Sequence, residues 1–352
     1  MLLPDLCVVV FVYDMPCFKP LTAWRPKSNS GCKKLVFNPT HAEQPDDPLQ
    51  ISCGQCKGCR LERSRQWAVR CLHESQCHEY NSFITLTFNE EMIQKRNVSR
   101  YDLDVTEFQK FMKRLRKHYD HCAHCGYKKN KCECDMYEQK WKIRFFHCGE
   151  YGDISGRPHY HAIIFGTDFS EDRVLWKQNF DGHNLYTSPT LSKLWSCPDT
   201  GKPYGYAVIG EVTFESAAYV ARYVMKKVNG DQAEDHYRKI VVDEETGTFE
   251  EYQLKPEYTT MSRRPGIGKE WFDKFKTDVY PSDFITVNGK KCTVPKYYDK
   301  LLEMEDPYLL QDLKAKRAEK VLQYAEDNTP ERLMARAAVF GRRMEKLIRN
   351  VE

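Results

Sequence analysis

The sequence predicts an α+β protein with a central, mainly antiparallel sheet flanked by helices, and its strand and helix patterns support that prediction. Strand-forming segments occur at 82–88, 141–148 and 159–165, and the first alternates strictly between apolar residues and serine or threonine. A short segment containing glycine and proline joins the last two, which is typical of a hairpin. Amphipathic helical patterns at 58–79 and 104–119 do not alternate with the strands as regular βαβ units, so antiparallel pairing is expected.

Further strands and a helix follow in the second half of the chain. A short strand is expected at 206–212, and a helix of good helix formers at 216–228. A strand pair is expected at 281–296, because Asn288-Gly289 is a dipeptide typical of tight hairpin turns.

The end of the chain is helical and highly charged from about residue 306. The pattern breaks at Asn328-Thr329-Pro330, where the threonine can cap and the proline can open a second helix. We expect three regions: an N-terminal arm with a cysteine-rich segment (1–57), a central domain (58–275) with a cysteine-rich insertion (121–137), and a C-terminal hairpin with charged helices (276–352).

Composition excludes several classes of protein. Of the 352 residues, 41% are hydrophobic and 30% charged, a globular balance that argues against a disordered, collagenous or coiled-coil chain. Lys and Arg number 54 against 50 Asp and Glu, so any site for a polyanion must be a local patch. No stretch approaches the ~20 apolar residues that span a bilayer, and no basic leader precedes the apolar run at 7–13. We therefore expect a cytoplasmic protein with no membrane partner.

The first candidate site is His159-Tyr160-His161 on a predicted strand. Side chains two residues apart on a strand point to the same face, so both imidazoles could grip one metal ion. A His-x-His pair also arises by chance in a chain with 11 histidines, so the spacing alone leaves a purely structural interpretation open.

The second candidate is the helix that carries Tyr219 and Tyr223, with Lys226 and Lys227 one turn beyond. The two phenols lie on one helix face, and a tyrosine beside a cation could attack a phosphodiester. Considered alone, the segment is more typical of an amphipathic helix with aromatic residues in the core.

In this order along one chain, the Thr-Leu-Thr-Phe strand, the His-x-His strand and the Tyr-x-x-x-Tyr helix resemble the three motifs of the HUH superfamily of rolling-circle replication initiators. The sequence is still more similar to the replication initiation proteins of the Microviridae, especially the gokushoviruses. The resemblance spans roughly residues 15–275 and rests on 15–17 (Met-Pro-Cys), 53–60 (Cys-Gly-Gln-Cys-Lys-Gly-Cys-Arg), 82–88 (Ser-Phe-Ile-Thr-Leu-Thr-Phe), 145–152 (Phe-Phe-His-Cys-Gly-Glu-Tyr-Gly), 157–161 (Arg-Pro-His-Tyr-His), 219–227 (Tyr-Val-Ala-Arg-Tyr-Val-Met-Lys-Lys) and 261–268 (Met-Ser-Arg-Arg-Pro-Gly-Ile-Gly). Because the family usually starts at the position of Met15, residues 1–14 are expected to be an extension or a misassigned start.

The resemblance implies the HUH/Rep nuclease fold for 58–275 and a metal ion at its centre. His159 and His161 would hold Mg²⁺ or Mn²⁺, which polarises the scissile phosphate. A third protein ligand is usual, and Glu150 is expected to supply it, because a carboxylate suits a hard cation; His147 is the alternative.

The resemblance also implies the activity. Tyr219 and Tyr223 would be alternating nucleophiles that nick single-stranded origin DNA, form a 5′-phosphotyrosine link and rejoin the ends, with Lys226 or Lys227 stabilising developing charge. No Walker-type sequence is present, so a host helicase would unwind the DNA in the bacterial cytoplasm. The alternative is a zinc-containing DNA-binding protein without catalysis, such as a repressor.

Two groups of cysteines could bind metal. Cys53, Cys56 and Cys59 resemble a motif common in the phage family, and the fourth ligand could be Cys71, His73 or Cys77. The predicted insertion contains the second group, a candidate structural zinc site made of Cys122, Cys125, Cys132 and Cys134. Reduced thiols or a disulfide pair are the alternatives.

Basic residues are the candidates for DNA contacts. Arg263 and Arg264 precede Pro265-Gly266 in a basic loop that could follow a single strand, and Arg157 precedes the His-x-His strand. The arginines and lysines on the helices at 60–70 and 113–117 are more typical of solvated faces.

Overall fold

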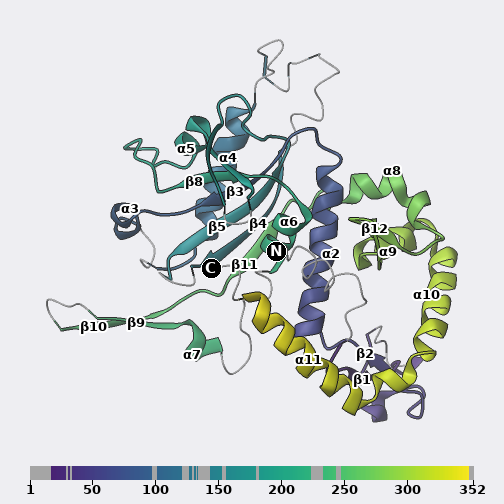
Figure 1. Cartoon of the computed structure of the whole chain (residues 1–352). Helices are drawn as coiled ribbons and strands as arrows, with labels where there is room; N and C mark the ends of the chain where they lie inside the picture. Colours follow the sequence, from purple (N-terminus) through teal and green to yellow (C-terminus); the bar gives the residue numbers. More distant parts are fainter. Residues whose placement is uncertain are drawn as a thin grey trace. The chain divides into compact units, whose positions relative to one another are not determined.

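The computed structural model divides into two compact units, one of residues 64–278 and one of residues 1–63 together with 279–352. It describes residues 17–28, 31, 34–96, 101–120, 127–128, 131, 133, 143–152, 156–179, 182–222, 233–242 and 247–348. The boundary between the units falls within helix α2 (Lys57–Ser75). Each unit is considered separately (Figure 1).

The unit of residues 64–278 is built on a seven-stranded sheet. Its strands run in the order β11-β4-β5-β3-β8-β7-β6, and every neighbouring pair is antiparallel. The prediction of an α+β protein with a mainly antiparallel sheet is therefore confirmed. The strands are β3 (Asn81–Leu86), β4 (Arg144–Tyr151), β5 (Pro158–Phe165), β6 (Val174–Gln178), β7 (Asn184–Thr187), β8 (Ala207–Gly210) and β11 (Tyr258–Met261).

Helix α4 (Val105–His118) covers one face of this sheet. Its N-cap is Asp104, whose side chain accepts a hydrogen bond from the backbone N–H of Thr106 at 2.8 Å. Its apolar stripe, led by Phe108 and Phe111, is buried in the main core together with alternate residues of β3, β5 and β8. The helix predicted at 104–119 is thus confirmed, and it gives the sheet one dry face.

Helices α2 and α6 (Phe214–Arg222) lie on the opposite face. Trp67 of α2 packs on Phe146 of β4 with ring centroids 5.0 Å apart, and α6 lies against β4 and β5 (Figure 1). On β3 the residues of this face are only partly buried, whereas those of the α4 face are fully buried. A partly open, polar sheet face is where a site can form.

Shorter elements complete this unit: α3 (Glu90–Gln94), α5 (Pro189–Leu194), α7 (Ala233–Tyr237), the hairpin of β9 (Arg238–Val242) with β10 (Phe249–Gln253), and α8 (Lys269–Val279). The hairpin projects away from the sheet (Figure 1). The sequence did not reveal the strand β6, because all five of its residues are exposed and so show no alternation between buried and exposed positions.

The other unit contains two small strand pairs and three helices: β1 (Leu21–Ala23) with β2 (Leu49–Ile51), β12 (Ile285–Val287) with β13 (Lys290–Cys292), α9 (Lys296–Glu305), α10 (Pro307–Leu322) and α11 (Pro330–Ile348). The predicted hairpin turn is confirmed, with φ of 48° at Asn288 and 75° at Gly289. The predicted break before Pro330 is confirmed as well, since α11 begins there. No helix in the described part of the chain is long and apolar enough to cross a membrane.

A buried ion pair joins three segments of the sheet-containing unit. Glu74 of α2 accepts hydrogen bonds from the Arg144 guanidinium and from the backbone N–H of Gly268, the latter at 2.6 Å. Arg144 also donates to the carbonyl of Pro265 at 2.8 Å. Burial opposes ionisation of Glu74, but the hydrogen bonds from His78 and Gly268 and the charge of Arg144 lower its pKa below the ordinary value. The pair therefore fixes the 262–268 loop against α2 and β4.

We predict that Glu74→Ala destabilises the protein by about 3–5 kcal/mol, because it leaves the Arg144 guanidinium buried without a counter-charge. Urea unfolding followed by circular dichroism measures the effect. The control is Glu91→Ala, which removes an exposed partner of Lys95 and should leave the unfolding midpoint nearly unchanged. Equal midpoints for both variants would contradict the role of the buried pair.

Candidate active site

Glu150, His159 and His161 lie on one face of the β4–β5 hairpin. Glu150 pairs directly with His159 across the two strands, and Cys148 pairs with His161. Paired residues of antiparallel strands share a face, as do residues two apart on one strand. The face is the one on which α6 lies, because Tyr219 of α6 contacts the His161 ring.

His161 is held from both sides. Its Nε2 lies 2.7 Å from Glu150 Oε1, and its Nδ1 lies 2.9 Å from the Thr85 hydroxyl on the neighbouring strand β3. The side chains of His161 and Glu150 are both more than nine-tenths buried. Strand pairing and two hydrogen bonds thus fix the orientation of this imidazole.

His159 is positioned by its own strand entry. Its Nδ1 donates to the backbone carbonyl of Arg157 at 2.8 Å, so the lone pair of the neutral ring is on Nε2. Its ring is nearly parallel to that of His161, with centroids 6.5 Å apart. Burial, and then the neighbouring His161, lower the pKa of His159 below the ordinary value. A neutral histidine with a defined tautomer is the form that binds metal.

His147, the alternative third ligand, points to the other face of the sheet. It stacks on Phe108 of α4 with centroids 3.5 Å apart, and its Nδ1 lies 3.0 Å from the Thr260 hydroxyl. Its side chain is fully buried, and burial lowers its pKa well below the ordinary value. Because β4 alternates, Glu150 faces His159 and His161 whereas His147, three residues earlier, cannot.

Tyr219 stands beside the histidines. Its ring meets that of His161 edge-on at a centroid distance of 5.3 Å, and that of Phe83 at 6.1 Å. Tyr219 is partly buried on α6. Tyr223, Lys226 and Lys227 lie outside the described residues.

The donor set fits a divalent metal ion. Two imidazole nitrogens and a carboxylate oxygen suit Mn²⁺, and the separation of 2.7 Å between His161 Nε2 and Glu150 Oε1 is close to the roughly 3 Å expected for adjacent ligands of one ion. The three side chains are less closely gathered than a formed metal site would be, since only cysteines form a set of ligand atoms within 4.8 Å of one another in the described part of the chain.

Comparisons with known proteins agree with this arrangement. A family model described as replication-associated protein ORF2 matches residues 81–228, which contain β3, the β4–β5 hairpin and α6. Replication-associated protein ORF2 of Spiroplasma virus 4 is 31% identical over 321 residues, covering 86% of each chain. The chain belongs to the replication-associated proteins of the microviruses.

Two further relatives of this replication-associated protein are more distant. Replication-associated protein VP4 of Bdellovibrio phage phiMH2K is 27% identical over 311 residues, covering 88% of this chain and 84% of that one. Replication-associated protein ORF4 of Chlamydia phage 1 is 28% identical over 255 residues, covering 72% of this chain and 53% of that one. No solved structure matches the chain significantly.

The replication-associated protein also contains a four-cysteine cluster, made of Cys17, Cys53, Cys56 and Cys59. Their sulfur atoms all lie within 4.8 Å of one another, so the cluster could hold a metal such as zinc. The three predicted cysteines are thus brought together, but the fourth member is Cys17.

The fourth ligands expected from the sequence are excluded by their surroundings. Cys71 is fully buried, and His73 stacks on Trp271 with centroids 3.5 Å apart. Cys77 is also buried, and none of the three belongs to the cluster. The predicted zinc site in the insertion (Cys122, Cys125, Cys132 and Cys134) lies outside the described residues.

The basic candidates for DNA contacts differ in their surroundings. Arg263 and Arg264 are exposed in the loop that the Glu74–Arg144 pair holds. Arg157 is about one-third exposed and forms an ion pair with Glu90.

Arginines of the helical charge runs bind the protein itself. Arg65 is buried, Arg70 donates to the carbonyl of Ile267 at 3.0 Å, and Arg114 donates to that of Leu194 at 2.8 Å. These guanidinium groups connect helices to neighbouring loops, and this use explains part of the charge that the sequence left open.

Sequence reasoning missed an exposed aromatic pair, Trp176 of β6 and Tyr206 just before β8. Their rings stack with centroids 6.3 Å apart, although they are 47% and 72% exposed, and the Lys177 amine lies 4.3 Å from the Trp176 ring centroid. Nothing in their spacing signals that β7 and β8 bring them together.

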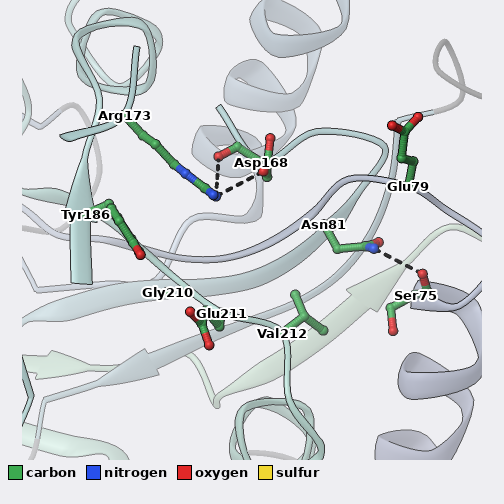
Figure 2. A pocket seen from close by; sticks show the side chains of 9 residues that line it. All are labelled: Ser75, Glu79, Asn81, Asp168, Arg173, Tyr186, Gly210, Glu211 and Val212. Carbon is green, nitrogen blue, oxygen red and sulfur yellow. Dashed lines mark hydrogen bonds and ion pairs between the residues drawn. The ribbon is translucent and has the colours of Figure 1, made fainter. Parts of the chain in front are cut away.

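A pocket of about 260 Å³ lies elsewhere on the sheet, where β3 begins and β8 ends (Figure 2). Its lining contains three carboxylates, Glu79, Asp168 and Glu211, against one cation, Arg173, which pairs with Asp168 at 3.0 Å. Such a lining repels phosphate. The histidines and Glu150 are at the opposite end of β3, so this pocket is separate from the candidate active site.

Proposed function

We propose that this protein initiates rolling-circle replication by nicking single-stranded origin DNA with a tyrosine. The observation that carries the proposal is the placement of the Tyr219 ring beside His161, on the sheet face that also holds His159 and Glu150. A non-catalytic repressor would not need a phenol next to a potential metal site. Membership in a replication-associated family supports the same conclusion.

The reaction is a transesterification. The Tyr219 oxygen attacks the scissile phosphorus, a phosphorus–oxygen bond to tyrosine forms, and the bond to the 3′ oxygen breaks, so a 3′ hydroxyl leaves and the phenolic proton goes to solvent or a nearby base. Mg²⁺ or Mn²⁺ bound by His159, His161 and Glu150 would polarise the phosphate. Thr85 holds the His161 ring in place for this task.

A second nucleophile completes the cycle. The circle must be cut again while the first 5′ end is still attached to the protein, and one tyrosine cannot hold one end and attack another. Tyr223, one helical turn beyond Tyr219, is proposed as that second nucleophile, with Lys226 or Lys227 stabilising developing charge.

The sheet suggests a path for the DNA strand. Glu150 pairs with His159, extension of the β3–β5 register by one residue places Thr87 opposite His159, and the Thr87 N–H donates to the Tyr206 carbonyl at 2.9 Å. The row therefore reaches from the site to Tyr206, whose Cα lies about 10 Å from that of His159. We propose that a base next to the nick stacks on the exposed Trp176–Tyr206 pair.

Other contacts and partners follow from the same proposal. Arg263 and Arg264 are proposed to bind phosphates, because they are exposed on a fixed loop, and Arg157 is a weaker candidate because Glu90 already pairs with it. A host helicase is the proposed partner for unwinding, and the cytoplasm of the bacterial host is the proposed location.

The two tyrosines give the sharpest test. Tyr219→Phe and Tyr223→Phe should each still form a denaturation-resistant adduct with labelled single-stranded origin DNA and Mn²⁺, and the double variant should form none. Neither single variant should complete repeated circles. An adduct that persists in the double variant, or that mass spectrometry maps to another tyrosine, would sink this mechanism.

The metal ligands can be tested against a histidine on the other face. His161→Ala should reduce adduct formation by at least about 100-fold while DNA binding changes little, because phosphate contacts elsewhere supply most of the affinity. His147→Phe, which keeps the stack on Phe108, should leave adduct formation within a few-fold of the wild type. Equal loss of activity in both variants, with both still folded by circular dichroism, would argue against the assignment of ligands.

The aromatic pair can be tested by binding alone. Tyr206→Ala and Trp176→Ala should each weaken binding of single-stranded origin DNA, measured by fluorescence anisotropy, by about 1–3 kcal/mol, or roughly 5- to 150-fold. Tyr308→Ala, which removes an equally exposed aromatic ring from α10, is the control and should bind like the wild type. Unchanged affinity in both test variants would exclude the pair from the DNA path.

A further inference from the structure

The four-cysteine cluster has the dimensions of a site for a single metal ion. Cys53 Sγ lies 4.0 Å from Cys59 Sγ, and Cys56 Sγ lies 4.0 Å from Cys17 Sγ. Four thiolates about 2.3 Å from one tetrahedral ion lie about 3.8 Å from one another. We propose that Cys17, Cys53, Cys56 and Cys59 bind one Zn²⁺ ion as a structural site.

Backbone N–H groups surround the sulfur atoms as they surround metal-bound thiolates. Cys53 Sγ accepts from the N–H of Cys56 at 3.3 Å and from that of Gln55 at 3.5 Å, and Cys56 Sγ accepts from Phe18 at 3.3 Å. Gly54, at φ +74°, allows the tight turn that aims these donors at Cys53. The turn is thus shaped to stabilise negative sulfur.

The thiols do not share ionisation equally without a cation. Burial opposes ionisation of Cys53, but the N–H donors of Cys56 and Gln55 lower its pKa to about 7. Burial raises the pKa of Cys17 and of Cys59. A divalent ion would stabilise all four as thiolates and release their protons.

The segment that the cluster closes has little core of its own. Among its described residues between 17 and 56, the buried apolar side chains are Phe18, Ala23 and Ala42. The strand pair β1–β2 is only three residues long on each side. A segment of this kind gains its folding energy from a metal site, as small zinc modules do.

Other occupants fit the geometry less well. A disulfide needs sulfur atoms about 2.05 Å apart, about half the separations seen here, and the four cysteines are free. In an iron–sulfur cluster each thiolate binds a different iron, which spreads the four sulfur atoms further apart than one ion does.

The consequence is a fixed N-terminal segment. The ion would tie Cys17 to the 53–56 turn and to Cys59 in the first turn of α2, so that about 35 residues of chain are closed into one loop. This role is independent of the proposed nicking chemistry, which uses other residues.

The test uses the full-length protein purified under reducing conditions. In a Cys122→Ser, Cys125→Ser background, which removes the other candidate site, elemental analysis should find about one equivalent of zinc. Cobalt titration of the metal-free protein should produce the intense thiolate-to-cobalt charge-transfer bands of a tetrahedral thiolate site, and Zn²⁺ should abolish them.

Variants then assign the ligands. In the same background Cys17→Ser should lose the equivalent of zinc, Cys17→His should keep it because histidine is also a zinc ligand, and Cys197→Ser, a cysteine outside the cluster, should keep it. With metal removed by a chelator, limited proteolysis should newly cut within residues 18–52. Zinc content unchanged in Cys17→Ser, iron in place of zinc, disulfides found by mass spectrometry, or no metal bound by the reduced protein would each overturn the proposal.

Discussion

The register of strands β4 and β5 is the constraint on which the candidate site depends. Because Glu150 pairs with His159 and both share a face with His161, a carboxylate and two imidazoles converge without any loop to position them. A shift of one residue between the strands would place the carboxylate on the wrong face. The dry packing of α4 on the other face opposes such a shift, because it would expose buried core residues of β4 or β5.

The two faces of the sheet therefore have different tasks. The α4 face is fully buried and contains His147, whose ring serves as a flat packing surface against Phe108. The opposite face contains the residues proposed for chemistry, with Tyr219 above His161 and the Thr85 hydroxyl behind it. The same side-chain type thus supports the core on one face and is a candidate metal ligand on the other.

Short-range patterns predicted much of this arrangement. The period of two along β5 placed His159 and His161 together, and the helical spacing around Phe108 gave α4. The choice between Glu150 and His147 was open because both are polar, and only the hairpin register separates them. Contacts across long stretches of chain carry no such signal, and for that reason Cys17, which is 36 residues from Cys53, was missed as a member of the cysteine cluster.

The central strand β3 separates two parts of the sheet that can evolve at different rates. The residues proposed for chemistry are on β4, β5 and α6, whereas the exposed rings of Trp176 and Tyr206 are on the far side of β3. Substitutions in the edge strand β6 leave the pairing of β4 with β5 untouched. Relatives could therefore change the bases they prefer at their origins, as their phage genomes diverge, while the nicking apparatus stays the same.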